Sequence, residues 1–319
     1  MITMRDWGPR AATSLAVAGA LAGCLAAAAG DAGAQTKERR LLGIANAGTN
    51  DDFLTSDILD RWRTGALTIN LTWGPEITPG APIAFGDVLE VRFRGEILAP
   101  EDIDNPQPDD RPYSTALSFG LHTHFRSSGT DYRLGADLVV TGPQTGLSSL
   151  QETLHEWQNL PDPSAAADEE LSDAVHLTVS GEASRELALT GSIAARPFVA
   201  ARVGDEIYAR IGADFVGGSL NSGGLLVRDY ATGALYEATR GTQTGFGWSL
   251  GVDVASVAYS AHLPTFAVDH EPTRTRARAS VMWAFDRWSA FIGTSYLSEE
   301  FTEQDEGQIV GVFGLSTSF

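Results

Sequence analysis

The chain has 319 residues, enough for one large domain or two small ones. Its 41 acidic and 22 basic residues give a formal net charge of −19, which argues against nucleic acid as a partner because phosphate binding needs a basic surface. After Gly30 no apolar run is long enough for a membrane helix. Helical membrane proteins are thereby excluded, but membrane β-barrels are not, because their strands alternate between apolar and polar residues.

The first 34 residues have the features of an export signal. Arg5 and Arg10 form a basic start, and residues 11–29 are small and apolar. Ala32-Gly33-Ala34 resembles a signal peptidase site. The sequence therefore predicts a signal peptide over residues 1–34 and a mature domain over residues 35–319.

The only cysteine, Cys24, follows Leu21-Ala22-Gly23, which also fits a bacterial lipoprotein signal. We expect ordinary cleavage instead, because a closed barrel needs no lipid anchor. A mature chain that begins at Gln35 has no cysteine and needs neither disulfides nor thiol chemistry.

Beyond this leader, apolar and polar residues alternate in several separate runs. These runs cover residues 66–73, 89–97, 117–125, 132–138, 207–215, 246–254 and 309–319. A tilted membrane strand needs about 9–11 residues, and the runs approach this length. Charged residues such as Glu90 and Arg92 on the polar face fit a wet interior, and the terminal Phe319 is typical of bacterial outer-membrane barrels.

These patterns predict an all-β protein, an antiparallel transmembrane β-barrel of about twelve strands with a short helix in one loop. The alternative is a soluble sandwich or lipocalin-like barrel, because alternation alone does not separate these classes. The export signal, the many strands and the terminal phenylalanine together favour the bacterial outer membrane.

Three loops are predicted over residues 100–111, 142–172 and 266–278. Only the second leaves a strand and continues into a short amphipathic helix. One apolar face of this helix consists of Leu147, Leu150, Leu154 and Trp157. Gln151 and His155 are four residues apart, so their side chains are neighbours on another face. This Gln/His pair beside membrane strands indicates a candidate site.

Each of these features also has a purely structural interpretation. Gln151 could belong to a capping box that starts with Ser148, and His155 could be an exposed helical histidine. Asn50-Asp51 could form a turn. His122 and His124 share one strand face and could bind a metal, but we expect both histidines to line the lumen.

Four separated segments resemble the lipid A 3'-O-deacylase family of outer-membrane barrels. The segments are Asn50-Asp51 with Asp60-Arg61-Trp62-Arg63-Thr64-Gly65, then Asp110-Arg111-Pro112-Tyr113, then Gly142-Pro143 with Gln151 and His155, and finally Glu300-Phe301 with Gln304 and the last strand. The resemblance extends over nearly the whole predicted mature chain. It implies a twelve-stranded barrel that hydrolyses the acyl ester at the 3' position of lipid A with the help of calcium.

The resemblance also implies catalytic roles for His155, Thr64 and Arg111, and the helical spacing adds one for Gln151. His155 would be the general base that activates water, since an imidazole titrates near neutral pH. Gln151, one turn away, would orient the imidazole or the water. Thr64 and Arg111 would complete the polar site, and an arginine can hold an oxyanion or a phosphate.

Asn50 and Asp51 would hold Ca²⁺ and orient the ester carbonyl. Calcium prefers oxygen ligands, and a bound cation stabilises the negative charge that the carbonyl oxygen gains in the transition state. The lipid A phosphates are anionic, as is the chain, so binding is expected to need divalent cations or local arginines.

Three functions compete at this stage. The first is the lipopolysaccharide ester hydrolase, acting on lipid A in its own membrane as a monomer or dimer. The second is a non-catalytic barrel of the same fold, either a pore or a scaffold. The third is a serine lipase barrel, which needs a nucleophilic serine two residues after the histidine. Glu156 and Trp157 follow His155, so this function is disfavoured.

Overall fold

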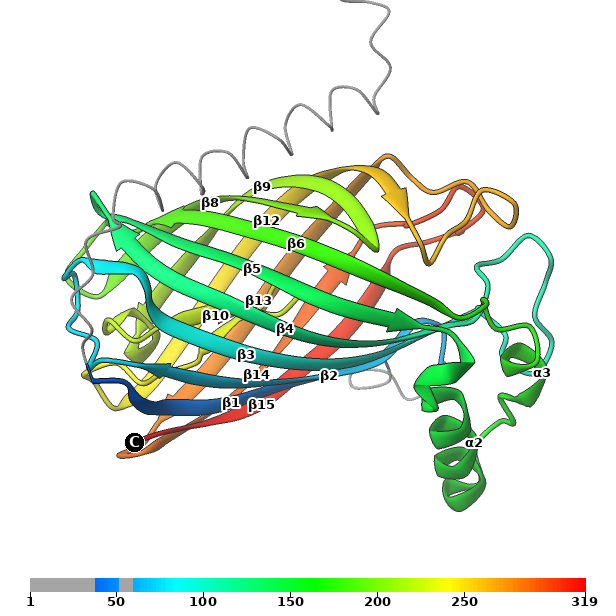
Figure 1. Cartoon of the computed structure of the whole chain (residues 1–319), viewed down its shortest axis with the longest axis horizontal. Coiled ribbons are helices and arrows are strands. Elements are labelled where there is room, and N and C mark those ends of the chain that lie inside the picture. The colour runs from blue at the N-terminus through cyan, green and yellow to red at the C-terminus, as the bar shows by residue number, and fades with distance from the viewer. Residues whose placement is uncertain (1–37, 52–59) are drawn as a thin grey trace, which may run out of the picture.

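The computed structural model describes residues 38–51 and 60–319, so the predicted signal peptide lies outside the described residues. Twelve long antiparallel strands form a closed barrel (Figure 1). The strands are β1 (Arg40–Asn50), β2 (Trp62–Gly74), β3 (Ile83–Ala99), β4 (Ser114–Ser127), β5 (Thr130–Thr141), β6 (Ala174–Arg185), β8 (Ile193–Val203), β9 (Glu206–Gly218), β12 (Gly245–Ser260), β13 (Thr273–Ala284), β14 (Trp288–Leu297) and β15 (Gln308–Ser318). The short β7 (Leu187–Ala188) follows β6 and pairs with the start of β8.

Closure of the barrel comes from pairing between the first and last strands. Gly43 of β1 is opposite Ser318 of β15, and Asn50 is opposite Gly311. Closure pairs the backbone groups of the edge strands, which a hydrocarbon environment requires. The predicted fold class, an antiparallel barrel of about twelve strands, is confirmed.

The two faces of the strands divide as the alternation predicted. On β2, Leu67 is exposed on the outer surface, whereas Thr68 and Asn70 are buried inside. On β3, Arg92 points inward and forms an ion pair of 2.7 Å with Glu90. The interior is therefore polar and the outer surface apolar, as lipid contact requires.

The paired histidines of β4 line this interior, as expected. His122 Nε2 lies 3.2 Å from Asp137 Oδ1, and His124 Nε2 lies 2.6 Å from Glu90 Oε2. Each imidazole therefore has its own carboxylate inside the barrel.

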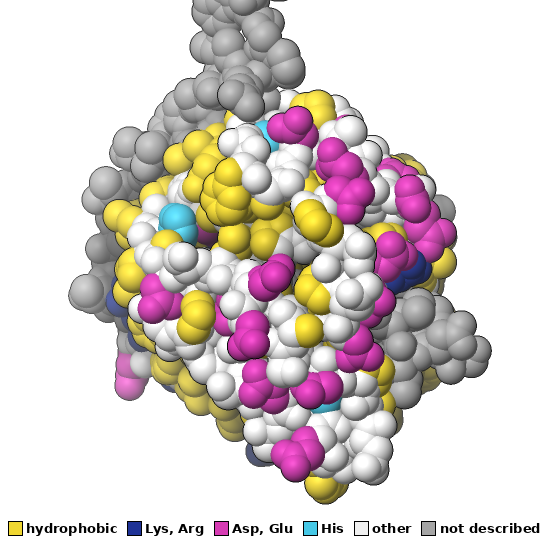
Figure 2. All heavy atoms as spheres, turned by 90° about the vertical axis from the view of Figure 1, so that its right-hand side faces the viewer, with side chains coloured by type: hydrophobic (Ala, Val, Ile, Leu, Met, Phe, Trp, Pro, Cys, Tyr) yellow, Lys and Arg dark blue, Asp and Glu magenta, His cyan; other side chains and the backbone are white. Residues whose placement is uncertain are grey.

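The two ends of the barrel differ in their connections. The C-terminus and the start of β1 share one end, here called the termini end, and the opposite end is called the loop end (Figure 1). At the loop end most connections are long, namely residues 51–61, 100–113, 142–173, 261–272 and 298–307. In outer-membrane barrels the longer loops lie on the cell exterior, so the predicted outer-membrane location would put the loop end on the outside. Figure 2 views this end, where acidic side chains are spread across the surface.

Exposed aromatic residues mark the levels at which the outer wall meets the membrane surfaces. Phe246, Trp283, Trp288 and Phe319 are exposed near the termini end, and Tyr259 and Tyr296 near the loop end. Amphipathic rings of this kind gather at the headgroup level of a bilayer. The apolar wall between them is the part that faces hydrocarbon.

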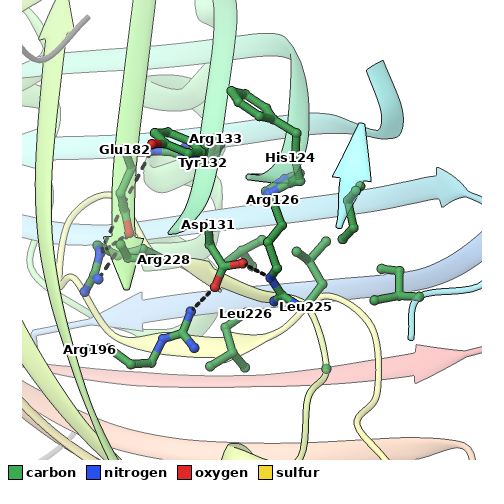
Figure 3. Close-up of a pocket in the computed structure, with 16 residues that line it drawn as sticks. His124, Arg126, Asp131, Tyr132, Arg133, Glu182, Arg196, Leu225, Leu226 and Arg228 are labelled. Atoms are coloured by element: carbon green, nitrogen blue, oxygen red, sulfur yellow. Dashed lines mark hydrogen bonds and ion pairs between the residues drawn. The ribbon is translucent and has the colours of Figure 1, made fainter. Parts of the chain in front are cut away.

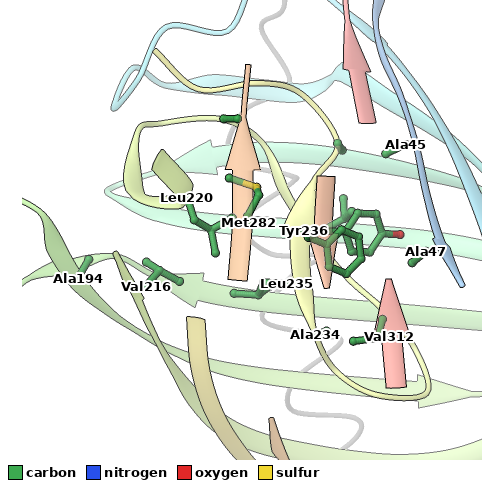
Figure 4. Close-up of a cluster of buried hydrophobic side chains, with 14 residues drawn as sticks. Ala45, Ala47, Ala194, Val216, Leu220, Ala234, Leu235, Tyr236, Met282 and Val312 are labelled. Atoms are coloured by element: carbon green, nitrogen blue, oxygen red, sulfur yellow. The ribbon is translucent and has the colours of Figure 1, made fainter. Parts of the chain in front are cut away.

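Residues 219–244 connect β9 to β12 at the termini end and fold back into the barrel, forming what we call the plug. The plug contains η3 (Ser219–Asn221), β10 (Leu226–Arg228) and β11 (Leu235–Glu237). Its Tyr236 hydroxyl donates to Asn70 Oδ1 at 2.6 Å, and Arg276 donates to the carbonyl of Tyr230 at 2.7 Å. An apolar cluster that includes Leu235 and Tyr236 packs it against the inner wall (Figure 4). The alternation of the flanking strands gave no sign of this inward fold.

Ion pairs surround the plug on its polar side. Asp131 accepts hydrogen bonds from Arg126 and Arg196, the latter at 3.0 Å (Figure 3). Arg228 of the plug donates to Glu182 Oε2 at 3.2 Å. The charged groups of the lumen therefore neutralise one another.

One predicted loop is corrected by the structure. Residues 266–278 were expected to be a polar loop, but β13 begins at Thr273. Its arginines alternate with outward residues and find buried carboxylates on other strands, such as Arg278 with Asp214 at 2.6 Å. Those carboxylates are distant in the sequence. The arginines therefore have no evident partner in their own segment, and the segment was predicted to be a solvated loop.

Candidate functional site

The long connection between β5 and β6 carries three short helices at the loop end. They are η2 (Pro143–Thr145), α2 (Leu147–Gln158) and α3 (Ser164–Ala167). In the described parts of the chain, no helix is both long and apolar enough to cross a bilayer. Thr115 at the start of β4 ties this connection down, because its hydroxyl donates to the carbonyl of Gly142 at 3.2 Å.

The start of α2 excludes the capping box that the sequence left open for Ser148 and Gln151. Its N-cap is Gly146, in the left-handed region at φ 71°, which glycine adopts without strain, and no side chain caps the helix. Ser148 and Gln151 are instead buried together with His155 on one face. Gln151 is therefore available for a different contact.

A chain of hydrogen bonds fixes the orientation of the His155 ring. The Tyr113 hydroxyl donates to Gln151 Oε1, so the amide nitrogen of Gln151 points the other way, toward His155 Nε2 at 3.3 Å. On the opposite side of the ring, His155 Nδ1 contacts the carbonyl oxygen of Pro161. A carbonyl only accepts, so Nδ1 carries the proton and Nε2 keeps its lone pair in the neutral ring.

Burial keeps Tyr113 in its donor form. Its phenol is buried at the start of β4, and burial raises the pKa of Tyr113 above its ordinary value, with Glu170 adding to the effect. The hydroxyl is therefore protonated throughout the physiological range. Because it remains a donor, the Tyr113 hydroxyl keeps the Gln151 amide in one orientation.

Asp60 lies on the other side of the same imidazole. Its Oδ2 is 3.2 Å from His155 Nε2, and both residues are buried. The Asp60 carboxylate and the His155 imidazole are therefore in direct contact. Asp60 and Tyr113 both lie in segments that carried the family resemblance, but sequence reasoning gave neither a role. Only their contacts with the Gln/His pair reveal one.

The predicted metal ligands lie where β1 ends and β2 begins. Asn50 is opposite Gly65 of β2. The backbone nitrogen of Asp51 donates to the Thr64 carbonyl at 3.3 Å, and Asp51 Oδ2 accepts from the backbone nitrogen of Arg61 at 2.8 Å. Asn50, Asp51 and Thr64 are thus brought together at the loop end.

The donors at this junction fit a calcium ion. Thr64 Oγ1 is buried and has no hydrogen-bond partner among the described residues. Over residues 38–51 and 60–319 there is no cluster of three or more His, Cys, Asp or Glu side chains that suits a metal. A set made of one carboxylate, an amide, a hydroxyl and backbone carbonyls is of a different kind, and it is one that calcium accepts.

Arg111, in the connection between β3 and β4, is almost fully buried. Its Nη1 donates to Glu300 Oε2 at 2.9 Å, and Arg63 donates to Glu300 Oε1 at 2.7 Å. Burial alone would raise the pKa of Glu300, but Arg63, Arg274 and Arg111 lower it to about 2. The structure therefore shows Arg111 in an ion-pair network that adjoins Thr64 through Arg63. Its predicted contact with substrate stays a prediction.

Among the six predicted site residues, Gln151 contacts His155 and Asp51 contacts Thr64, and the other links pass through intervening residues. The links run from Gln151 and His155 to Asp60, from Arg61 to Asp51, and from Arg63 through Glu300 to Arg111. They join four segments that are far apart in the sequence. These links place the predicted residues in neighbouring segments at the loop end of the barrel.

Comparison with solved structures supports the barrel fold through one of three structures, LpxR. LpxR from Salmonella typhimurium has a TM-score of 0.71 at 19% sequence identity, with 87% of this chain and 100% of that chain covered. The β domain of the Bordetella autotransporter BrkA has a TM-score of 0.46 at 11% identity, covering 88% of this chain and 99% of that one. The KdgM porin has a TM-score of 0.39 at 7% identity, covering 87% and 99%.

A search of curated proteins finds no match to this sequence. The sequence pattern of the family described as outer membrane protein LpxR matches residues 15–319, which includes every segment of the site. The resemblance to outer-membrane lipid A deacylases is therefore confirmed. This chain belongs to the LpxR family.

Proposed function

We propose that this protein is a calcium-dependent hydrolase that removes the 3'-O-linked acyl group of lipid A, using water activated by His155. The observation that carries the proposal is the hydrogen-bond chain from Tyr113 through Gln151 to His155. Together with the Pro161 carbonyl on the other side of the ring, it holds the imidazole with Nδ1 toward Pro161 and Nε2 toward Gln151 and Asp60. Ester hydrolysis by water needs such a base.

The first chemical step is removal of a proton from water. The Gln151 amide nitrogen lies 3.3 Å from His155 Nε2. The amide would move away to admit a water molecule between them, since a bridging water separates its two partners by about 4.5–5.5 Å. That water would accept from the Gln151 amide and donate to Nε2, which fixes its lone pair toward the ester carbon. As Nε2 gains the proton, the carboxylate of Asp60, 3.2 Å away, stabilises the resulting imidazolium.

Asn50, Asp51 and Thr64 would hold the calcium ion. The bound ion would stabilise the negative charge that develops on the ester carbonyl oxygen. The partnerless hydroxyl of Thr64 supports this assignment. Arg63, next to Thr64 in β2, donates two hydrogen bonds to Glu300. These bonds connect the start of β2 to the loop of residues 298–307.

The position of the site fits a glycolipid of the outer leaflet. α2 starts against the outer surface of the barrel, where Leu147 lies beside Gly95 of β3 and Leu117 of β4. These are positions on the apolar face of the wall. An ester bond at the boundary between sugar and acyl chain would therefore reach His155 without leaving the membrane.

The competing functions are weakened by particular residues. The plug fills the termini end of the lumen, which argues against the pore alternative. Trp157 occupies the position where a serine lipase would need its nucleophile. An assay of lipid A deacylation distinguishes the hydrolase from a scaffold without activity.

The test uses purified protein, hexa-acylated lipid A and Ca²⁺, with mass spectrometry of both the remaining lipid A and the released fatty acid. We expect loss of the 3'-linked acyl group with the wild type, and no loss with His155→Ala or in EDTA. His122→Gln is the matched control, because His122 is a luminal histidine of mid-β4 bound to Asp137.

Three outcomes would count against the proposal. Intact lipid A after incubation with folded wild-type protein and calcium favours the scaffold. Full activity in EDTA removes the role of calcium. Full activity of His155→Ala removes the proposed base.

A further inference from the structure

α2 turns its polar face toward the protein and its apolar face away from it. Ser148, Gln151 and His155 are buried. In contrast, Leu150 is 50% exposed, Leu154 is 42% exposed and Trp157 is 78% exposed. A helix on a water-soluble protein normally does the reverse and buries its apolar stripe.

The helix in fact has three faces rather than two. Ser149, Thr153 and Glu156 are also exposed, and at 100° per residue they form a polar face about 135° from the buried face and about 100° from the apolar face. If the exposed side of α2 contacted only water, polar and apolar residues could be mixed on it. Here they are on two separate faces. The separation indicates two different surroundings, one wet and one apolar.

The apolar face of α2 continues the lipid-facing wall of the barrel. Leu147, at the start of α2, lies beside Gly95 and Leu117 on the outer surface of β3 and β4. Farther along the same wall, Phe93 and Phe119 are exposed. Figure 1 shows α2 projecting sideways from the loop end, across the barrel axis rather than along it. A helix in this position lies parallel to the membrane plane.

We propose that α2 is an interfacial anchor whose Leu150, Leu154 and Trp157 side chains are embedded in the acyl chains of the surrounding outer leaflet. Amphipathic helices that lie in the membrane plane bury such faces at the boundary between headgroups and chains, and tryptophan is enriched there. The occupant is lipid rather than protein because the face is continuous with a wall that already contacts lipid. The anchor would hold His155, on the adjoining face, at a fixed depth in the leaflet.

The direct test measures what surrounds each face. Single cysteines replace Leu154 and, as the matched control two residues away on the polar face, Glu156, both in a Cys24→Ser background. Each cysteine carries an environment-sensitive fluorophore, and the barrel is reconstituted in phosphatidylcholine vesicles. Iodide then quenches from the water, and doxyl-labelled phosphatidylcholine quenches from the membrane. Heat-modifiable gel mobility confirms that each variant is folded.

We expect the label at Leu154→Cys to be quenched by doxyl lipid and protected from iodide, and the label at Glu156→Cys to show the opposite pattern. Equal iodide quenching at both positions would overturn the proposal, because the apolar face would then lie in water. Protection of the Leu154→Cys label from both quenchers would also overturn it, because another protein surface would then cover the face. These readouts do not depend on enzymatic activity.

A second measurement rests on the proposed hydrolase function. Replacing Leu150, Leu154 and Trp157 by serine should lower deacylation of lipid A in vesicles by about tenfold or more, since helix depth depends on buried apolar area. The same variant should retain activity on lipid A dispersed in detergent micelles, where no leaflet sets the depth. An equal loss in both forms would show that the three residues act through folding of the site instead. Absence of activity in the wild type would count against the hydrolase and leave the fluorescence result to decide the anchor.

Discussion

Glu300 is the common partner of three arginines, two of them buried, so its charge should make a large contribution to stability. Its pKa lies at about 2 instead of the usual 4.5. Each pKa unit corresponds to about 1.4 kcal/mol, so ionised Glu300 should stabilise the folded protein by about 3 kcal/mol. This agrees with the roughly 3–5 kcal/mol that is lost when one member of a buried ion pair is removed.

The perturbation is Glu300→Gln, which keeps the shape of the side chain and removes its charge. Because the pKa of Glu300 is lowered on folding, its stabilisation is present above pH 4.5 and is lost as the pH falls toward 2. Glu300→Gln should therefore be less stable than the wild type by about 3 kcal/mol at pH 7. The difference should shrink below pH 4.5 and approach zero near pH 2.

The assay is urea unfolding of the detergent-refolded barrel, followed by tryptophan fluorescence between pH 7 and pH 2. Glu303→Gln is the control, since Glu303 is an exposed carboxylate of the same loop, and it should change stability little at any pH. Equal stabilities of wild type and Glu300→Gln at pH 7 would refute the reasoning. So would a difference that does not change with pH.

Three further predictions concern the catalytic region. Tyr113→Phe removes the donor that orients the Gln151 amide, so kcat should fall by about tenfold with little change in KM, and an unchanged kcat would show that this orientation is unimportant. Asp60→Asn should lower kcat by about 10–100-fold without unfolding the barrel, and a wild-type rate would exclude stabilisation of the imidazolium. Thr64→Val should raise the calcium concentration needed for half-maximal activity, whereas Thr68→Val, a buried luminal threonine of the same strand, should not. An equal shift in both variants would argue against Thr64 as a ligand.

Much of the barrel could be predicted from sequence because its signal is local. Alternation along each strand depends only on which side of the wall a residue faces, and the runs around Leu67, Phe93 and Phe119 end up with their apolar side chains outward. The plug could not be predicted in this way. Leu235 and Tyr236 form a short apolar pair whose packing partners lie on distant strands, and nothing local distinguishes an inward fold from a surface loop.

The candidate site was predictable only as a set of separate segments. The spacing of Gln151 and His155 placed them on one helical face, and the structure confirms their contact. Which residues orient the ring depends on the path of distant loops, so Asp60 and the carbonyl of Pro161 emerged only from the three-dimensional arrangement. The inverted burial of α2 also lies beyond sequence patterning, since the pattern identifies an apolar face without saying what it contacts.

The plug has a consequence for the movement of reaction products through the barrel. Residues 219–244 and their ion pairs occupy the termini end of the lumen, so a fatty acid cleaved at the loop end would meet this plug on a path through the barrel. Such a product would then stay on the side of the loop end and leave by lateral diffusion within the leaflet or by escape into the medium. Turnover of this protein would then change the composition of the surface layer without returning carbon to the cell.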